Sequence, residues 1–139
     1  MLVSVVVPFY NEEESLKPFY DAITQVIDSV ERYEFELVFS NDGSKDQSVE
    51  ILQKIMINDS RVKIVDLSRN YGKETALLAG LDHAEGDAVI MMDSDLQHPP
   101  YLIPEFLKWW EQGYDDIYAC LFFTSPSPRD PKTSRLASS

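Results

Sequence analysis

The stretch Ala88-Val89-Ile90-Met91-Met92-Asp93-Ser94-Asp95-Leu96-Gln97-His98-Pro99-Pro100 joins an apolar run of strand length to a polar loop that two prolines close. We expect a buried strand here and the chemistry of the protein where that strand ends. Asp93, Asp95 and Gln97 offer hard oxygen ligands of the kind that Mg²⁺ or Mn²⁺ prefers, without the nitrogen or sulfur that zinc usually takes. A cation held there could bind a diphosphate. The simpler alternative is a polar turn held by side-chain to backbone hydrogen bonds.

Three similar units precede this stretch, each an apolar run followed by a polar loop and then by apolar residues at helical spacing. The expected strands are 2–7, 35–40, 62–67 and 88–92. Because these runs are almost continuously apolar, they suit a parallel sheet with both faces covered. The alternation of strand and helix predicts a three-layer α/β/α fold with a mostly parallel sheet and ligands at the carboxyl ends of its strands.

Local signals set the expected ends of these elements. Pro8 is expected to end the first strand, and Ser15 to cap a helix that tolerates Pro18 in its first turn. The capping-box pattern Ser44-Lys45-Asp46-Gln47 predicts that the second helix starts there. The third helix is rich in Ala and Gly, which predicts close packing against the sheet. A fourth helix, after the two prolines, is expected to stop at Gly113.

Composition places this chain of 139 residues among globular proteins, with 44% hydrophobic and 12% aromatic residues. The net charge of −12 argues against nucleic acid as a partner, because no basic stripe can replace phosphate counterions. The single cysteine, Cys120, excludes an intramolecular disulfide and fits a reducing compartment. We recognise neither a secretory signal nor a membrane-spanning run, and so expect a soluble, cytoplasmic chain.

Residues 120–139 break the pattern of strands and helices. The segment from Ser125 to Arg135 is rich in Pro, Ser and Thr, as disordered tails are. We expect one folded domain at 1–119, with a fifth strand beginning at 117–119, followed by a disordered tail that is not native to the domain.

Four polar loops are expected at one edge of the sheet, and together they resemble those of one family. The loops are Pro8 to Glu12, Asn41 to Ser44, Arg69 to Lys73, and Asp93 to Pro100. They are similar to the loops of family 2 nucleotide-diphosphosugar glycosyltransferases, and most of all to the dolichyl-phosphate or polyprenyl-phosphate (bactoprenol) sugar transferases. Each motif alone is weak, whereas four in order at strand ends are specific. The resemblance covers 1–119 and implies the Rossmann-like GT-A fold.

The resemblance implies roles for individual residues. The implied nucleotide-binding residues are Pro8, Tyr10, Asn11, Glu12, Asp42, Arg69, Lys73 and Asp93. Asp42 would accept hydrogen bonds from the base, because a carboxylate only accepts and a uracil or guanine edge offers N–H donors. Asp93 and Asp95, the implied catalytic residues, would join Gln97 in binding the Mg²⁺ or Mn²⁺ that bridges the diphosphate. For the loop from Arg69 to Lys73, the alternative is a surface turn permitted by its glycine.

Other side chains keep simpler interpretations. His98 is expected to shape its loop rather than act as a base, and Glu13 to do no more than favour a helix start. Tyr101 and the tryptophans 109 and 110 are expected to pack in the core or on a helix face rather than against lipid.

The implied reaction is displacement at the anomeric carbon of a nucleoside-diphosphate sugar by a polyprenyl or dolichyl phosphate. A phosphate acceptor is already an anion, whereas a sugar hydroxyl would need a general base. Full members of the family are much longer, so the chain resembles their donor-binding part and is expected to be weakly active or inactive alone. The parent enzyme is expected at the cytoplasmic face of the membrane, which it would contact through the C-terminal part that is missing here.

Two alternatives stay open on the sequence. One is a soluble family 2 transferase that acts on a glycan or polysaccharide acceptor, and the other is a catalytically inactive nucleotide-binding domain. The sequence does not select the sugar, the base or the oligomeric state.

Overall fold

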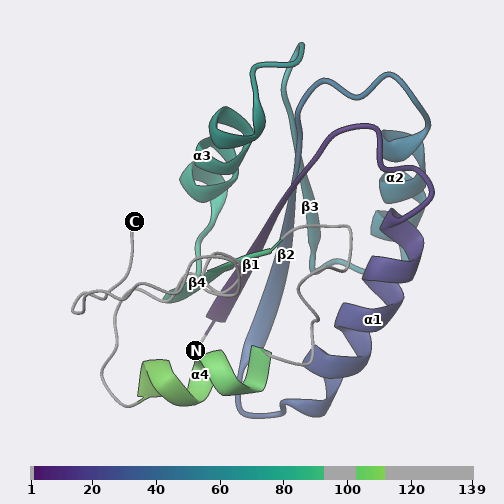
Figure 1. Ribbon diagram of the computed structural model, residues 1–139. Coiled ribbons are helices and arrows are strands. Elements are labelled where there is room, and N and C mark those ends of the chain that lie inside the picture. The colour runs from purple at the N-terminus through teal and green to yellow at the C-terminus, as the bar shows by residue number, and fades with distance from the viewer. Residues whose placement is uncertain (1, 93–102, 112–139) are drawn as a thin grey trace.

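Parallel strands form a sheet at the centre of the molecule (Figure 1). The structure is a computed structural model that describes residues 2–92 and 103–111. Its strands are β1 (Leu2–Phe9), β2 (Glu34–Asn41), β3 (Val62–Asp66) and β4 (Ala88–Met91), in the spatial order β3-β2-β1-β4. Its helices are α1 (Leu16–Ser29), α2 (Ser48–Asn58), α3 (Lys73–His83) and α4 (Ile103–Glu111). Each pair of neighbouring strands is parallel, so the strands end at the same edge of the sheet.

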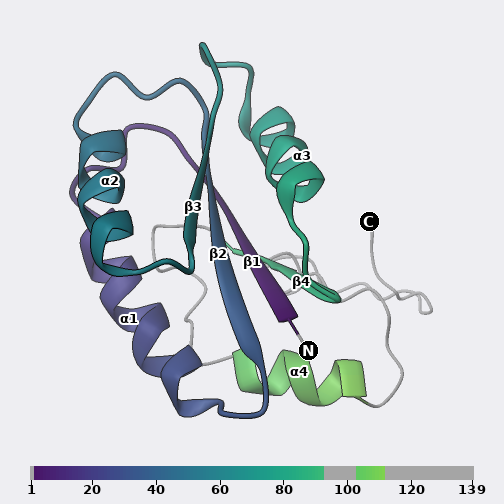
Figure 2. The ribbon, with the colours of Figure 1, turned by 180° about the vertical axis from the view of Figure 1, so that it is seen from behind.

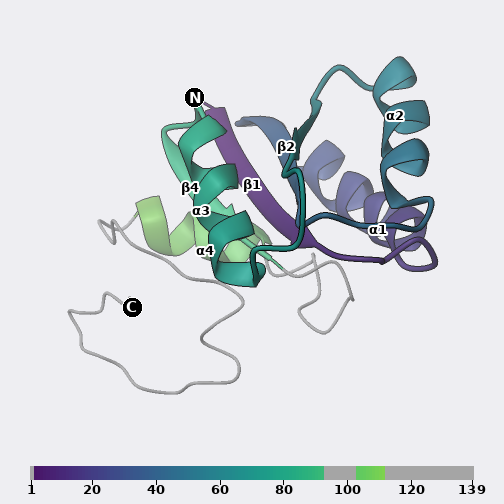
Figure 3. The same ribbon diagram turned by 90° about the horizontal axis from the view of Figure 1, so that it is seen from above.

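Helices cover both faces of this sheet, which confirms the predicted three layers. Helices α1 and α2 lie on one face and α3 on the other, as Figures 2 and 3 show from behind and from above. Successive side chains of β1 enter different cores: Val5 and Val7 pack with α1 and α2, whereas Val6 packs with α3. Helix α4 joins the first core through Ile103 and Leu107. The strands are apolar throughout because both faces are buried.

Helix α3 approaches the sheet closely because small residues lie at the contact. A Cβ atom added to Gly80 would lie 2.5 Å from Val6 Cγ1 and 3.5 Å from Ser40 Cβ. The Ser40 hydroxyl donates a hydrogen bond of 2.6 Å to the carbonyl of Ala76. The predicted close packing of this helix is confirmed.

Pro8 lies inside β1, and the prediction that it ends the strand is wrong. The Val6 carbonyl accepts a hydrogen bond from the Met92 N–H, on the side of β4. The backbone of Pro8 points to the same side as that of Val6, because the two residues are two positions apart in the strand. The paired residues of β1 and β4 end at Val6 and Met91, before Pro8. Its missing N–H therefore falls past the paired part of the ladder, where proline is tolerated.

Helix α2 begins at Ser48, and the prediction that it begins at Ser44 is wrong. The Ser44 hydroxyl accepts a hydrogen bond of 2.8 Å from the Asn11 N–H, in the loop after β1. Asp46 accepts hydrogen bonds from the N–H of Ser48 at 2.9 Å and from its hydroxyl at 2.6 Å. Ser44, which the local pattern predicted as the helix cap, therefore bonds instead to the loop after β1.

The start of helix α1 agrees with the sequence in position, but Ser15 does not make the expected capping hydrogen bond. Ser15 is the residue before the helix and Pro18 lies in its first turn, as predicted. The Ser15 hydroxyl donates to the carboxylate of Glu12 at 2.7 Å and does not cap a helical N–H.

Helix-face packing is confirmed for Trp110, whose ring meets Tyr33 edge-on with 6.4 Å between centroids. No helix within the described residues is both long enough and apolar enough to cross a bilayer. Several predictions fall outside the described residues, namely those for Asp93, Asp95, Gln97, His98, Tyr101, Gly113, the strand at 117–119, the tail at 120–139 and the side chain of Trp109.

Candidate functional site

Polar loops follow β1, β2 and β3 at the carboxyl edge of the sheet. The strand register pairs Phe9 with Asn41 and Asn41 with Asp66, so these three strands end level with one another. The fourth loop follows Met92, and its residues lie outside the described part of the chain. The predicted convergence is therefore confirmed for three of the four loops.

Reciprocal hydrogen bonds join the loop after β1 to the loop after β2. They run from Asn11 N–H to Ser44 Oγ (2.8 Å), Lys45 N–H to Asn11 Oδ1 (2.8 Å), Glu13 N–H to Asp46 Oδ2 (3.1 Å) and Gln47 N–H to Glu13 Oε1 (2.9 Å). Asn11 and Glu13 thus each donate a backbone N–H and accept through the side chain. Burial alone would raise the pKa of Asp46, but the hydrogen bonds that it accepts, chiefly from Ser48, lower it. The two loops behave as one connected unit.

Asp42 connects this unit to the loop after β3. Its side chain is buried, with 4% of the residue exposed. Its Oδ1 accepts hydrogen bonds from the N–H groups of Tyr71 at 2.8 Å and Gly72 at 3.1 Å, and its Oδ2 lies 3.1 Å from the Gly72 nitrogen. The Asp42 N–H donates to the Phe9 carbonyl at 2.9 Å. Asp42 therefore connects the loops after β1, β2 and β3: its backbone N–H bonds to the end of β1, and its carboxylate bonds to the loop after β3.

Gly43 allows the loop after β3 to lie directly against it. A Cβ atom at this position would lie 2.4 Å from both the carbonyl carbon of Arg69 and the nitrogen of Asn70. Its φ of +78° also lies in the left-handed region, which glycine adopts most readily. Both the backbone contact and the conformation therefore require glycine here.

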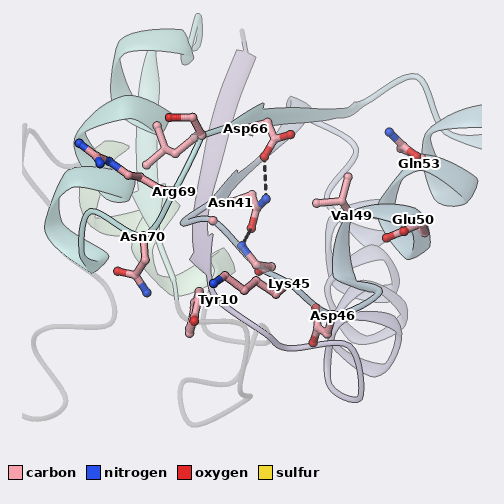
Figure 4. A pocket seen from close by; sticks show the side chains of 14 residues that line it. Tyr10, Asn41, Lys45, Asp46, Val49, Glu50, Gln53, Asp66, Arg69 and Asn70 are labelled. Atoms are coloured by element: carbon pink, nitrogen blue, oxygen red, sulfur yellow. Dashed lines mark hydrogen bonds between the residues drawn. The ribbon is translucent and has the colours of Figure 1, made fainter.

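An open pocket of about 670 Å³ lies between the loops after β2 and β3 and the first turns of α2 (Figure 4). This volume is within the range of roughly 300–1,000 Å³ that is usual for small-molecule sites. Asn41 lies beneath it, donating to Asp66 Oδ1 at 2.6 Å and accepting from the Ser44 N–H at 2.9 Å. The polar side chains around it include Tyr10, Lys45, Asp46, Glu50, Gln53, Asp66, Arg69 and Asn70.

The structure brings two of the predicted nucleotide-binding residues, Tyr10 and Arg69, to the wall of this pocket. Both side chains are exposed. The guanidinium carbon of Arg69 lies 5.1 Å from the centre of the Tyr71 ring, so a cation–π contact orients it. Lys73 is exposed at the first residue of α3.

The other predicted residues of this edge lie below or beside the pocket. Pro8 is buried in β1, and Asp42 is buried under the loop after β3. The Glu12 N–H donates to the Ser48 hydroxyl at 3.0 Å, so Glu12 lies where the first loop meets α2. Asp93 lies outside the described residues.

Most residues that line the pocket were not predicted as site residues from the sequence, among them Lys45, Asp46, Gln53 and Asp66. Asp66 carries a usable signal, because it is an acid at the carboxyl end of a predicted strand, as Asp42 is. Gln53 lies within α2, where the spacing of apolar residues predicts the buried face of the helix. It does not predict which loops lie near the polar face. Glu13 was also missed, since its position suggested only a solvated helix start.

Within residues 2–92 and 103–111, no three or more His, Cys, Asp or Glu side chains are grouped so as to hold a metal ion. The expected ligands Asp93, Asp95 and Gln97 follow β4 and lie outside the part of the chain that the structure describes. Their donor set of carboxylate and amide oxygens suits Mg²⁺ or Mn²⁺ chemically.

Comparison with known proteins gives a family match over nearly the whole chain. The family model described as "Glycosyl transferase family 2" matches residues 4–137. The uncharacterized glycosyltransferase YkcC of Bacillus subtilis is 47% identical over 116 residues, which are 84% of this chain and 36% of that protein. The bactoprenol glucosyl transferase of Shigella phage SfV is 45% identical over 119 residues, which are 86% of this chain and 38% of that protein. The chain thus spans little more than a third of the length of these relatives.

Solved structures with a similar fold include two enzymes with bound ligands. The mannosyltransferase PcManGT from Pyrobaculum calidifontis, in complex with GDP-Man and Mn²⁺, superposes with a TM-score of 0.69 at 24% identity, covering 81% of this chain and 33% of that one. Glucosyl-3-phosphoglycerate synthase from Mycobacterium tuberculosis, in complex with Mn²⁺, UDP and glucosyl-3-phosphoglycerate, gives a TM-score of 0.56 at 28% identity, covering 76% of this chain and 38% of that one.

Proposed function

Because the chain belongs to glycosyl transferase family 2, we propose that it binds a nucleoside-diphosphate sugar as the donor-binding part of a transferase whose acceptor is a polyprenyl phosphate. The observation that carries this proposal is the polar pocket at the carboxyl edge of the sheet, with Tyr10 and Arg69 in its wall. Ligands of open α/β sheets bind at this edge. The name of the phage bactoprenol glucosyl transferase supports the polyprenyl acceptor.

Each proposed nucleotide contact follows from the chemistry of the side chain. Tyr10 offers an exposed ring for stacking. Asp42 already accepts from the Tyr71 and Gly72 N–H groups, so it would use only its remaining acceptor capacity for the N–H groups of a base. Arg69 and Lys73 would attract the diphosphate, which an acidic chain can bind only through local positive charge. Pro8, Asn11 and Glu12 would shape the first loop around the nucleoside.

We also propose that the donor site uses Mg²⁺ or Mn²⁺, held by Asp93, Asp95 and Gln97. Support comes from their oxygen donors and from the Mn²⁺ in the glucosyl-3-phosphoglycerate synthase complex. A bound cation of this kind would neutralise the charge that grows on the leaving diphosphate, which makes Asp93 and Asp95 the proposed catalytic residues.

An acceptor that is not a lipid is the second candidate. The similarity to glucosyl-3-phosphoglycerate synthase favours it, since the name of that enzyme describes a small soluble product. An assay that offers the full-length parent enzyme both polyprenyl phosphate and soluble glycan acceptors separates the two candidates. In the first case the sugar moves into the lipid extract, and in the second it stays in the aqueous phase.

A thermal-shift panel of nucleoside diphosphates, each with and without Mn²⁺, tests donor binding by this chain. We expect one base to raise the melting temperature most and Mn²⁺ to increase that rise, because a ligand that binds the folded state stabilises it by mass action. Arg69→Ala should reduce the rise. Lys54→Ala, which removes an exposed cation of α2 outside the pocket, should leave it unchanged. A melting temperature that no nucleoside diphosphate raises would contradict the proposal.

A further inference from the structure

We propose that Asp42 is a positioning residue: its buried carboxylate holds residues 69–73, the cationic loop, in the place from which Arg69 and Lys73 reach a diphosphate. The proposal deepens the proposed function and rests on it for the identity of the ligand. It gives Asp42 a task that exists before any nucleotide binds, in addition to any contact with the base.

The contacts of Asp42 are made to the backbone of the cationic loop. The N–H groups of the consecutive residues Tyr71 and Gly72 both point at the carboxylate, at 2.8 and 3.1 Å. Gly72 has a φ of +109° immediately before α3 begins at Lys73. The hydrogen bonds therefore fix the backbone turn at which the loop becomes a helix, and with it the start of the helix that carries Lys73.

The residue next to Asp42 confines the earlier part of the loop. Gly43 lies so close to the backbone of Arg69 and Asn70 that even a Cβ atom would not fit. Adjacent residues of the loop after β2 thus hold the cationic loop at two successive points, the backbone of Arg69 and Asn70 and the N–H groups of Tyr71 and Gly72. Arg69 lies over the exposed ring of Tyr71. The position of the Arg69 charge is consequently set from β2.

Electrostatics favour this arrangement in the absence of ligand. Hydrogen bonds to an ionised carboxylate are stronger than neutral ones, and a buried carboxylate without donors is costly. Asp42 is 4% exposed with the loop in place, so opening the loop would replace its two hydrogen bonds from N–H groups with contacts to water. A loop held in advance loses less conformational entropy when a diphosphate arrives, which strengthens binding.

Amide hydrogen exchange in the ligand-free chain tests the loop contact directly. We expect the Tyr71 and Gly72 amides to be protected in the wild type and to exchange about tenfold faster or more in Asp42→Asn. The matched control is Asp46→Asn, because Asp46 likewise accepts backbone hydrogen bonds, but from Glu13 and Ser48. It should free those amides and leave the Tyr71 and Gly72 amides protected.

Calorimetry with inorganic diphosphate plus Mn²⁺ tests the consequence for the cations. This probe has no base, so a residue that only recognises the base would not affect its binding. We expect Asp42→Asn to weaken diphosphate binding about tenfold, and Arg69→Ala to cost much less affinity in the Asp42→Asn background than in the wild type. This non-additivity would show that Asp42 acts through Arg69.

Three outcomes would overturn the inference: unprotected Tyr71 and Gly72 amides in the wild type, unchanged protection in Asp42→Asn, or freed amides with unchanged diphosphate affinity. If Asp42→Asn fails to fold, amide exchange in the wild type can still overturn the inference. If the wild type binds neither nucleoside diphosphate nor inorganic diphosphate, the proposed function fails, whereas amide exchange still shows whether Asp42 holds the loop.

Discussion

At the scale of single residues, Asn11 combines a backbone conformation with two contacts. Its φ of 51° lies in the left-handed region, where asparagine is among the few residues found often. From there its N–H reaches Ser44 and its side chain reaches the Lys45 N–H. Asn11 therefore connects the loop after β1 to the loop after β2, in addition to any contact with a ligand.

Among the described residues, Asp59 is a carboxylate whose charged form the fold stabilises strongly. It accepts hydrogen bonds from Arg61 Nε at 2.9 Å and from the Tyr20 hydroxyl at 2.6 Å. The hydrogen bond from Arg61 outweighs burial and holds the pKa of Asp59 at about 2. Burial, together with the hydrogen bond to Asp59, raises the pKa of Tyr20 to about 12. These contacts tie α1 to the turn before β3.

Asp59→Asn should lower the free energy of unfolding at pH 7 by about 2 kcal/mol, which corresponds to the depressed pKa. Because the folded pKa lies below the ordinary value of 3.8, the stabilisation is present above about pH 4 and is lost as the pH falls toward 2. Urea unfolding of wild type and variant at pH 7, 4.5 and 3 measures this.

Asp28→Asn provides the control for this prediction. Asp28 contacts the same arginine at 2.8 Å, but its side chain is 63% exposed, and exposed ion pairs contribute about 1 kcal/mol or less. If the difference in the free energy of unfolding between wild type and Asp59→Asn stays constant from pH 7 to pH 3, the ionised carboxylate of Asp59 is not the source of the stabilisation.

At the scale of the element, α3 packs close to the sheet because its contact face carries no large side chains. Its contact face offers Ala76 and Gly80, both buried, to Val6 and Ser40 of the sheet. Because α3 begins where the cationic loop ends, the depth of this helix also sets the height of that loop above the sheet. Small residues that do not line the pocket therefore contribute to its shape.

Gly80→Ala should destabilise the chain by about 1–3 kcal/mol, since overpacking forces the helix away from Val6. The loss is expected although alanine favours a helix over glycine by about 1 kcal/mol. Thermal or urea unfolding measures it. The control in the same helix is Leu78→Ala, because Leu78 is 62% exposed and should change stability by about 0.5 kcal/mol or less. A more stable Gly80→Ala variant would show that the contact is looser than described.

At the scale of the whole molecule, Glu36 joins the strands at the end of the sheet away from the pocket. Its carboxylate accepts hydrogen bonds from the Ser4 hydroxyl and from the Glu85 N–H, and it lies 2.7 Å from Lys63 Nζ. The Gly86 N–H donates to Ser4 Oγ at 2.8 Å. Burial opposes the charge, but the hydrogen bonds from Lys63, Ser4 and Glu85 lower the pKa of Glu36. The network connects β1, β2 and β3 with the turn that leads into β4.

Glu36→Ala should lower the free energy of unfolding by about 2–3 kcal/mol, because the buried donors around it lose their acceptor. Glu34→Ala, two residues earlier and exposed, should cost about 0.5 kcal/mol or less. Chemical unfolding at pH 7 compares the two. Equal effects would mean that the buried network contributes no more than a surface charge.

Much of this architecture could be predicted from sequence because its causes are local. Apolar runs of strand length and apolar residues three or four apart are properties of chain neighbours, and they located every strand and helix described. Regular alternation of strand and helix then led to parallel strands, and parallel strands have their carboxyl ends at one edge of the sheet. The prediction that Asn41, Asp42 and the loop from Arg69 to Lys73 would meet followed from this rule.

The sequence by itself thus determined the layers, the order of elements and the edge at which the candidate site lies. Only the tertiary structure decided how Ser44, Glu13 and Asp42 are used, because their partners lie 33, 34 and 29 residues away in Asn11, Gln47 and Tyr71. A capping pattern or an acidic turn in the sequence indicates which kinds of hydrogen bond a side chain can form. Which partner it bonds depends on which loops the sheet brings within hydrogen-bonding distance.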